Sequence, residues 1–289
     1  MRRITGRVLR WYGVHARDLP WRRPEATPWS IVVSEFMLQQ TPVSRVLEPW
    51  QRWTERWPSP TALATAPAGE AVRAWGRLGY PRRALRLHAA AGVMVQRHGG
   101  EVPRELDALR ALPGVGDYTA AAVASFAFGQ RHAVLDTNVR RVLGRVARGE
   151  AQPGAALTAA ERTLAVAFLP ARPQRAARWA VAAMELGALV CTARAPRCEV
   201  CPVRSTCRWR AAGRPPRSDP PRQGQPYAGT DRQCRGSLLA RLRATEGELA
   251  DTDLAAAWSD VPQRSRCLAS LVDDGLVERR PYERYALPA

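Results

Sequence analysis

Apolar side chains recur at helical spacing along most of this chain, whereas stretches that alternate apolar and polar residues are scarce. Residues 82–96 are typical, since alanines and leucines there are interspersed with arginines as in an amphipathic helix. The pattern therefore predicts an all-α body. Helices are expected over residues 4–15, 30–39, 43–56, 69–77, 83–98, 104–111, 117–129, 137–147, 157–169 and 174–190.

The composition changes after Arg210. Prolines crowd the run Arg214–Pro221, which predicts a stiff, solvated linker. Two short helices, a longer one and then a hairpin are expected beyond it, over 237–244, 253–258, 262–273 and 275–287 respectively. Helices followed by a hairpin are the order of a winged helix, a shape that binds nucleic acid. A small packing domain without a DNA role explains the same pattern equally well.

The charge of the chain points to a polyanionic partner. Its 289 residues carry 44 basic and 26 acidic side chains, a formal net charge of +18, and nucleic acid is the commonest partner for such an excess. All the basic residues are arginine. A coding bias explains why arginine replaces lysine, but it does not explain the excess over acidic residues. Because no lysine amine is present, Schiff-base chemistry is excluded except at the N-terminal amine.

Two kinds of targeting segment are missing from the pattern. No apolar stretch approaches the roughly 20 residues of a membrane span. The basic residues at the N-terminus are not followed by the apolar segment of a secretory signal. We therefore expect a cytoplasmic protein with no membrane partner.

Four of the six cysteines follow the spacing C-x6-C-x2-C-x5-C, at Cys191, Cys198, Cys201 and Cys207. Four thiolates in so short a run can converge on one metal centre, because short loops close at little entropic cost. A disulfide framework is disfavoured without a secretion signal. Spacing alone favours zinc. The other two cysteines, Cys234 and Cys267, are expected to be structural or incidental.

A glycine-containing turn and an aspartate follow one another in the middle of the chain. Residues 112–120, Leu-Pro-Gly-Val-Gly-Asp-Tyr-Thr-Ala, join two expected helices. The glycines allow close backbone approach, and the amides that start the next helix suit a phosphate. Asp136 stands where it would cap the helix that begins at Thr137. Such a cap is expected to stay ionised, as a cationic sugar transition state requires.

A second carboxyl lies in the apolar run Ile31–Thr41. On a helix, Glu35 shares a face with Ile31, Val32 and Leu38. A glutamate in such a helix usually lies at the polar edge. If it faces a pocket instead, desolvation favours the protonated form, which can act as a general acid. One protonated and one ionised carboxyl are the usual means of cleaving a glycosidic bond.

These segments together carry a family resemblance. The cysteine run resembles the 4Fe-4S loop of the endonuclease III and MutY families of DNA glycosylases, and residues 112–120 resemble the helix-hairpin-helix of that superfamily. Ser34–Thr41, Ser-Glu-Phe-Met-Leu-Gln-Gln-Thr, resembles the catalytic helix of MutY-type adenine DNA glycosylases, and Leu19–Arg22 fits as well. The resemblance covers the chain from about Leu19 to Cys207.

The resemblance implies an architecture and partners. The cofactor would be a 4Fe-4S cluster rather than zinc, and the partner double-stranded DNA with an adenine mispair, bound by a monomer. Residues 24–132 would form a six-helix barrel domain with the helix-hairpin-helix, and residues 1–23 and 133–211 an iron-sulfur cluster domain. A linker at 212–230 and a winged-helix-like unit at 231–289 would follow. Arginines beside the cysteines would contact phosphates, at Arg194, Arg197, Arg204 and Arg208.

The resemblance also implies residue roles. Glu35 would protonate N7 of adenine, Asp136 would stabilise the sugar cation, and Asn138 would support the sugar or the attacking water. Tyr118 falls where bifunctional members place a lysine nucleophile, so a monofunctional enzyme is expected, with Tyr118 hydrogen-bonded to a carboxylate. Tyr80 would wedge at the base step from which adenine is extruded. Contacts to DNA are implied for Leu38, Gln39, Gln40, Tyr80, Gly114, Val115 and Gly116.

The sequence departs from the family in its C-terminal part. Longer members carry a domain resembling a nucleotide-sanitising hydrolase that recognises 8-oxoguanine, and the roughly 70 residues after the linker do not match it. Thr137 and Pro81 replace the family's usual glycine and aromatic residue. Discrimination of 8-oxoguanine from guanine is therefore left open by the sequence.

Two other functions fit parts of the sequence. A glycosylase of the same fold could remove thymine opposite guanine, although the run Gln39–Thr41 argues against it. A non-catalytic DNA-binding protein could use the cluster as a structural staple, but the presence of all four catalytic-site residues disfavours this. An abasic-site lyase would require a lysine, so it is excluded.

Overall fold

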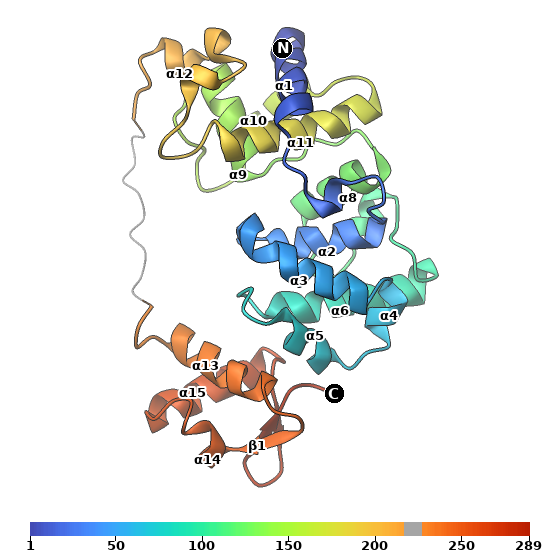
Figure 1. The fold of residues 1–289 in the computed structure, drawn as a ribbon, viewed down its shortest axis with the longest axis vertical. Coiled ribbons are helices and arrows are strands. Elements are labelled where there is room, and N and C mark those ends of the chain that lie inside the picture. Colours follow the sequence, from blue (N-terminus) through green and yellow to red (C-terminus); the bar gives the residue numbers. More distant parts are fainter. Residues whose placement is uncertain (217–226) are drawn as a thin grey trace. The chain divides into compact units, whose positions relative to one another are not determined.

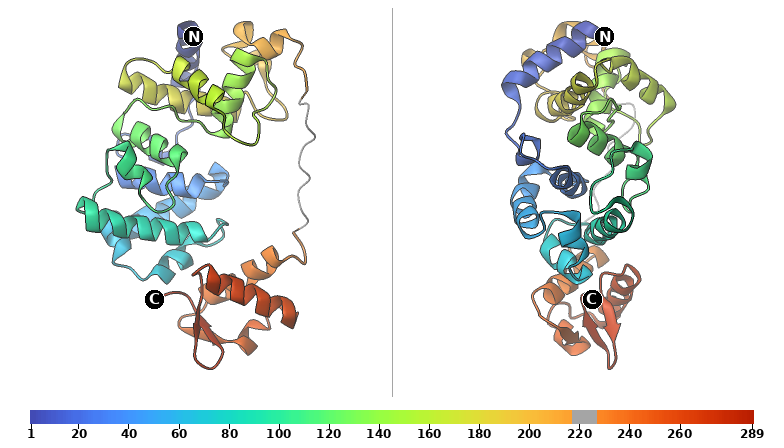
Figure 2. Two further views of the ribbon diagram at one scale, coloured as in Figure 1. Left: turned by 180° about the vertical axis from the view of Figure 1, so that it is seen from behind. Right: turned by 90° about the vertical axis from the view of Figure 1, so that its right-hand side faces the viewer.

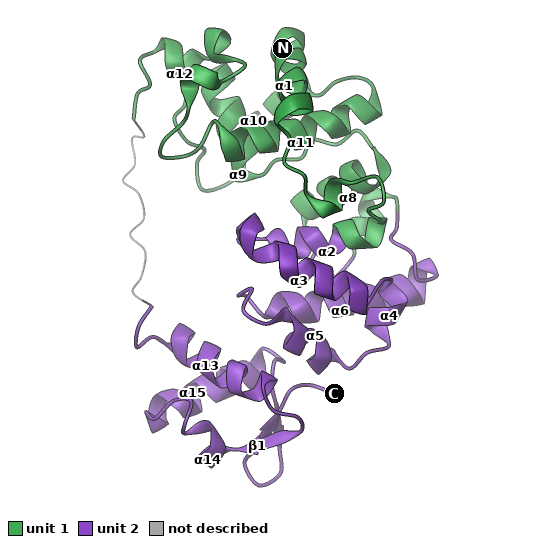
Figure 3. Ribbon diagram, viewed as in Figure 1, with its two compact units in different colours: residues 1–31, 104–111, 115–221 green, residues 32–103, 112–114, 222–289 purple. Residues whose placement is uncertain are grey.

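The computed structural model describes residues 1–216 and 227–289 (Figure 1). Most of the predicted linker Arg214–Pro221 lies outside the described residues. The chain divides into two compact units, coloured separately in Figure 3. Unit 1 comprises residues 1–31, 104–111 and 115–221, and unit 2 comprises residues 32–103, 112–114 and 222–289. These units do not coincide with the expected domains: residues 104–111 and 115–132 fall in unit 1, and the C-terminal domain (residues 227–289) packs against the 32–103 segment.

Unit 1 is a set of helices around one apolar core. Trp179 and Leu186 of α11 lie in that core together with Val8 of α1 and Val139 of α9. α10 begins with a capping box, in which Thr158 and Glu161 satisfy one another's backbone amides. The elements are α1 (Arg2–His15), α7 (Leu106–Arg110), α8 (Asp117–Phe128), α9 (Thr137–Leu143), α10 (Ala159–Phe168), α11 (Pro173–Leu189), α12 (Arg208–Ala211), 3-10 turns at Pro20–Arg22, Cys198–Val200 and Arg204–Thr206, and a π-helical turn at Gly144–Arg148.

Unit 2 combines the remaining helices with a small sheet. α2 (Pro28–Leu38) begins in unit 1 and belongs to unit 2 from Val32 onwards. α3 buries Val46, Trp50 and Trp53, which share one face of the helix. The other elements are α3 (Val43–Arg56), α4 (Pro60–Ala64), α5 (Ala68–Trp75), α6 (Arg82–His98), α13 (Asp231–Arg243), β1 (Glu248–Ala250), α14 (Asp251–Leu254), α15 (Val261–Asp273), β2 (Glu278–Arg280) and β3 (Arg284–Ala286).

The C-terminal domain has the element order of a winged helix, as the sequence predicted. Helix α13 is followed by β1, α14 and α15 and then by the β2–β3 hairpin, which Figure 2 shows from two further sides. The strands form an antiparallel sheet in the order β1-β3-β2, with Tyr285 paired to both Leu249 and Arg279. Strand β1 was not predicted, because it stands alone between two helices, without the adjacent partner strand and turn that mark a hairpin.

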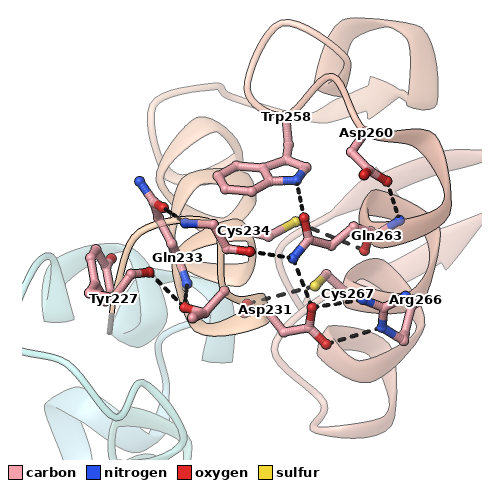
Figure 4. Close-up of polar contacts among 11 residues, drawn as sticks. Tyr227, Asp231, Gln233, Cys234, Trp258, Asp260, Gln263, Arg266 and Cys267 are labelled. Carbon is pink, nitrogen blue, oxygen red and sulfur yellow. Dashed lines mark hydrogen bonds and ion pairs between the residues drawn. The ribbon is translucent and has the colours of Figure 1, made fainter. Parts of the chain in front are cut away.

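Helices α13 and α15 are joined by a polar network and a pair of buried thiols (Figure 4). The carboxylate of Asp231 accepts hydrogen bonds from Arg266 (2.8 Å) and from the amide of Gln263 (2.9 Å). Cys234 and Cys267 are fully buried between these helices. Burial and the neighbouring Cys267 raise the pKa of Cys234 to about 12. Cys234 therefore remains protonated at neutral pH, and the burial of both cysteines in the core agrees with a structural role.

The helical pattern predicted most of the observed helices. Each of the ten expected stretches contains a helix whose ends lie within two residues of the expected ends, except that the stretch 137–147 continues beyond Leu143 as a π-helical turn. The short helices α4 and α12 were missed, because one turn leaves no periodic record in the sequence. None of the described helices is long and apolar enough to cross a membrane.

Candidate functional site

Helix α2 carries Glu35 into the interior of the protein. The helix is apolar all round, so Val33, Phe36 and Met37 are fully buried, and Glu35 itself is only 5% exposed. The default expectation of a glutamate at the polar edge is therefore wrong. A carboxyl so removed from water is costly to keep charged unless neighbours compensate.

The turn after α2 presents the three side chains expected to meet DNA. Leu38 and Gln39 are half-buried and Gln40 is exposed. Gln40 adopts a left-handed conformation with φ of 55°, which is uncommon for a residue other than glycine. The hydroxyl of Thr41 donates to the carbonyl oxygens of Gln39 and Leu78, both at 3.3 Å, so this turn is tied to the loop between α5 and α6.

That second loop carries Tyr80, the expected wedge. Tyr80 is 51% exposed and also left-handed, with φ of 47°. The carbonyl of the preceding Gly79 accepts hydrogen bonds from Trp75 Nε1 and Arg83 Nη2, both at 3.0 Å. Strained backbone persists only where its surroundings hold it, and here indole and guanidinium donors hold the peptide that precedes the strained residue.

Arg83, at the start of α6, connects both strained turns, and the sequence did not single it out. Its guanidinium donates to the carbonyls of Phe36 (2.8 Å) and Met37 (3.0 Å) at the end of α2, and to that of Gln39. It also donates to Thr41 Oγ1 and Gly79 O, both at 3.0 Å. Burial lowers the pKa of Arg83 to about 10, so the group remains charged at neutral pH. One buried cation therefore fixes the end of the Glu35 helix, the glutamine turn and the tyrosine loop.

The glycine turn at 112–116 uses its glycines in two different ways. Gly114 has a positive φ of 78°, and a Cβ there would lie 2.9 Å from the ring of Phe36 and 2.8 Å from Arg86 Cβ. Only glycine thus allows the backbone to approach helix α2 so closely. Gly116 is the N-cap of α8 and has extended backbone, so it does not use the left-handed region. Val115 is buried.

In unit 1, Asp136 caps α9 as predicted. Its carboxylate accepts hydrogen bonds from the Val139 amide (2.6 Å) and from Asn138 Nδ2 (2.7 Å). Burial raises the pKa of Asp136, while these two donors and Arg141 lower it, and the net direction is upward. The cap favours the ionised form, as expected, but desolvation opposes it and is the larger effect on the pKa.

Arg141 links the Asp136 region to the cysteine loop and was also not anticipated. It donates to Asn138 Oδ1 (2.8 Å), to Gly187 O of α11 (2.7 Å) and to Cys191 O (2.7 Å). Tyr118, on α8, packs against a small apolar cluster that includes Val134 and Ala180. Asp136, Asn138 and Tyr118 thus belong to unit 1, whereas Glu35, the glutamine turn and Tyr80 belong to unit 2.

The four spaced cysteines line one cavity in unit 1, together with Arg145 and Trp209. Arg145 is fully buried, stacks 4.3 Å over the Trp209 ring and donates to Cys191 Sγ at 3.4 Å. Burial and the other three thiols raise the pKa of Cys201 to about 11. A metal centre that binds thiolates would reverse that preference.

These residues fit an iron-sulfur cluster. The sulfur ligands and the buried arginine suit a cofactor whose thiolate shell is negative. Among the described residues, no group of three or more His, Cys, Asp or Glu side chains is placed to hold a single metal ion. Zinc, which spacing alone favoured, would use the same four thiolates, so the choice of an iron-sulfur cluster rests on the family match of this loop.

Comparisons with known proteins agree with this geometry. Residues 33–166 match the family described as HhH-GPD superfamily base excision DNA repair protein, and residues 191–207 match the iron-sulfur binding domain of endonuclease III. The chain is 53% identical to the adenine DNA glycosylase of Mycobacterium tuberculosis over 282 residues, which cover 97% of this chain and 92% of that protein. It is 43% identical to the adenine DNA glycosylase of Homo sapiens over 215 residues, 72% of this chain and 39% of that protein.

Solved structures show the same fold. A thermostable thymine-DNA glycosylase superposes with a TM-score of 0.64 at 28% identity, over 72% of this chain and 95% of that one. An endonuclease III trapped as a covalent intermediate with DNA superposes with a TM-score of 0.63 at 23% identity, over 73% of this chain and 96% of that one. The helical body is therefore a recurrent architecture.

Proposed function

Because the chain belongs to the adenine DNA glycosylase family, we propose that it excises adenine paired with 8-oxoguanine or guanine and leaves the DNA strand uncut. Its partner is DNA, and its four cysteines at 191–207 hold a 4Fe-4S cluster. We place the enzyme in the cytoplasm, at the nucleoid, as a monomer. The cluster supplies rigidity and charge to the loop that carries it, and the glycosidic chemistry belongs to side chains.

Glu35 is the proposed general acid. Protonation of adenine at N7 allows the C1′–N9 bond to break with its electron pair leaving on the base, so that adenine departs neutral. The proton comes from the Glu35 carboxyl, whose burial on α2 removes it from competing water.

Asp136 is the proposed stabiliser of the sugar. Loss of adenine leaves an oxocarbenium ion at C1′, which a nearby carboxylate stabilises electrostatically. Asn138 holds that carboxylate at 2.7 Å and supports the water that adds to C1′. The proton lost by this water returns to a carboxylate, which completes the hydrolysis.

The proposed enzyme makes no Schiff base with the opened sugar. The chain has no lysine, and Tyr118 stands at the position where bifunctional relatives have that nucleophile. A phenol hydrogen-bonded in the site cannot form an imine, so strand scission requires a separate step.

Two strained turns are proposed to probe the duplex. Gln40 and Tyr80 are exposed, and each has the positive φ that functional sites often impose on residues other than glycine. Extruding a base costs a few kcal/mol of unstacking, which an inserted side chain offsets. Leu38 and Gln39 would line the space beside them, and the turn Gly114–Gly116 would meet the phosphates.

The observation that carries the proposal is that both proposed catalytic carboxyls are withdrawn from water, Glu35 within α2 and Asp136 at the start of α9. A single-turnover assay tests it, with duplexes holding adenine opposite 8-oxoguanine, guanine or thymine and one holding thymine opposite guanine. Each is analysed with and without hot alkali. Alkali-dependent cleavage at adenine is the expected result, whereas cleavage only at thymine would indicate a mismatch thymine glycosylase.

Replacement of the general acid gives the first prediction. Glu35→Gln is expected to bind the mispair as tightly as the wild type and to cut it about 1000-fold more slowly, because only the proton donor is lost. The exposed Glu55→Gln on α3 is the matched control and keeps its rate. Turnover of Glu35→Gln at the wild-type rate would contradict the assigned mechanism.

A further inference from the structure

The C-terminal domain lacks the charge of a DNA-binding module. It contains nine arginines and ten acidic residues, whereas residues 1–216 contain 33 arginines and 15 acidic residues. Six of its nine arginines are in ion pairs with acidic side chains of the same domain, at Arg235, Arg264, Arg266, Arg279, Arg280 and Arg284. A winged helix that binds phosphates presents unpaired cations, so the winged-helix order alone does not account for this domain.

What the domain does contact is helix α5. Val72 of α5 is fully buried in the same apolar core as Leu238 and Leu242 of α13. The first amides of α5 have no partner within the helix, and the end of the chain provides one. Ala68 N–H donates to the carbonyl of Ala289 (3.3 Å) and Gly69 N–H to that of Pro288 (2.8 Å).

The other end of α5 is capped from α13. Arg243 donates to the carbonyls of Val72 (2.8 Å) and Gly76 (2.5 Å), which are among those left free at the C-terminal end of α5. The arrangement is reciprocal, because Arg73 of α5 donates to the carbonyls of Arg243 and Thr245, at the C-terminal end of α13. The Arg243 guanidinium therefore stabilises a helix end through backbone carbonyls, unlike the six arginines of the domain that pair with carboxylates.

Gly76 begins the loop that ends in Tyr80, and four consecutive carbonyls of that loop are held by side chains. Gly76 accepts from Arg243, Arg77 from Arg45, Leu78 from Thr41, and Gly79 from Trp75 and Arg83. Among these donors only Arg243 comes from the C-terminal domain. The loop is therefore anchored at its start by that domain and at its end by α6.

We propose that the C-terminal domain is an internal brace for the Tyr80 loop, and that Arg243 is a positioning residue which acts on base extrusion through Tyr80. The proposal rests on the proposed role of Tyr80 as the wedge. By clamping both ends of α5, the domain sets the position from which the loop departs and allows the left-handed Tyr80 backbone to persist before DNA binds. Pre-organisation of this kind lowers the cost of inserting the side chain.

The brace is tested first without DNA. In the full-length holoenzyme, Arg243→Met removes both hydrogen bonds and keeps an apolar stem, and Arg241→Met changes an exposed arginine of the same helix. Hydrogen exchange of the peptide spanning residues 76–80 is expected to be at least about tenfold faster in Arg243→Met and unchanged in Arg241→Met. Unchanged exchange in Arg243→Met would overturn the proposal, whatever its activity.

A double-mutant cycle tests whether the effect passes through Tyr80. Arg243→Met is expected to slow single-turnover excision about tenfold, and the double variant with Tyr80→Ala is expected to be no slower than Tyr80→Ala alone. If the two substitutions together slow excision by the product of their separate factors, the proposed coupling through Tyr80 is overturned. If Tyr80→Ala alone keeps the wild-type rate, the wedge assignment fails, while hydrogen exchange still decides the brace.

Gly69→Ala provides a second, independent perturbation. A Cβ there would lie 2.9 Å from Leu287 Cβ and still closer to the carbonyl oxygen of Pro288, so the end of the chain must move. Alanine strengthens an isolated helix relative to glycine, so α5 by itself is not weakened. Faster exchange at 76–80 supports the brace, and protection equal to the wild type contradicts it.

Discussion

At the scale of single residues, the charges of this enzyme are set by burial as much as by partners. Asp136 accepts two hydrogen bonds and faces Arg141, yet its pKa is raised because desolvation is the larger effect. Glu185 shows the opposite balance. Burial would raise its pKa too, but hydrogen bonds from Arg17 and Arg22 bring it down to about 2. Geometry alone therefore does not predict the sign of a shift.

Because desolvation and hydrogen bonds oppose one another in setting the pKa of Asp136, we predict a pH-dependent effect for Asn138→Ala. Removing the 2.7 Å hydrogen bond should raise the pKa of Asp136 further, so that the ionised form required for catalysis is lost at a higher pH. The acid limb of the single-turnover pH profile is expected to move upward, so that the loss of rate is larger at pH 6 than at pH 8. Thr137→Ala, the exposed neighbour, should leave the limb in place. A uniform loss at all pH values would contradict this assignment.

Glu185 predicts an effect on stability instead. Its pKa is depressed in the folded state, so its contribution is present above the unfolded value of about 4.5 and is lost as the pH falls towards about 2. Glu185→Gln leaves Arg17 and Arg22 without their anion and should lower the free energy of unfolding at pH 7 by about 3 kcal/mol. Urea unfolding measures this, with the exposed Glu101→Gln as control. A change as small as the control's would show that the pair contributes little.

At the scale of elements, the helices can be predicted from the sequence, but the contacts that connect their ends cannot. A helix that buries one face has apolar residues at helical spacing, which the sequence shows. Short motifs are enough to single out Glu35, Asp136 and the cysteines. Arg83 could not be recognised, because an arginine in an amphipathic helix looks like a solvent-facing residue. Its acceptors are mostly backbone carbonyls, which any sequence provides, so their convergence depends on the fold alone.

Arg83→Met tests whether the hydrogen bonds from Arg83 to these carbonyl groups hold the two turns in place. Removal of the guanidinium leaves several buried carbonyls unpaired, at about 1–3 kcal/mol each, and frees both strained turns. We expect the free energy of unfolding to fall by about 3 kcal/mol and single-turnover excision to slow about 100-fold. Arg97→Met, exposed on the same helix, is the control. Retention of the wild-type excision rate would show that the turns hold their shape without Arg83.

At the scale of the whole molecule, the excess of positive charge lies in the segment that contains the proposed catalytic residues. Residues 1–216 account for the full net charge of +18, whereas residues 227–289 are close to neutral. Exposed arginines flank the cysteine loop, among them Arg194 and Arg208. The electrostatic attraction to DNA is therefore expected to come from residues 1–216, which contain the proposed catalytic side chains.

This uneven distribution of net charge along the chain predicts how DNA binding depends on salt concentration. Arg194→Gln with Arg208→Gln should reduce the slope of log affinity against log salt by about 2, because each phosphate contact contributes nearly one counterion. Arg279→Gln with Arg280→Gln, in the hairpin of the C-terminal domain, should leave the slope unchanged. Titrations at several salt concentrations measure both. A reduced slope for the hairpin pair would mean that the winged helix binds DNA after all.

The capping of α5 has a consequence for how the protein is made. A ribosome releases the residues of α5 long before it reaches Arg243, and Pro288 and Ala289 emerge later still. The segments that carry Glu35 and Asp136 therefore emerge while both ends of α5 are still uncapped. With the C-terminal domain as the proposed brace, the Tyr80 loop takes up its position for meeting DNA only after that domain has been made.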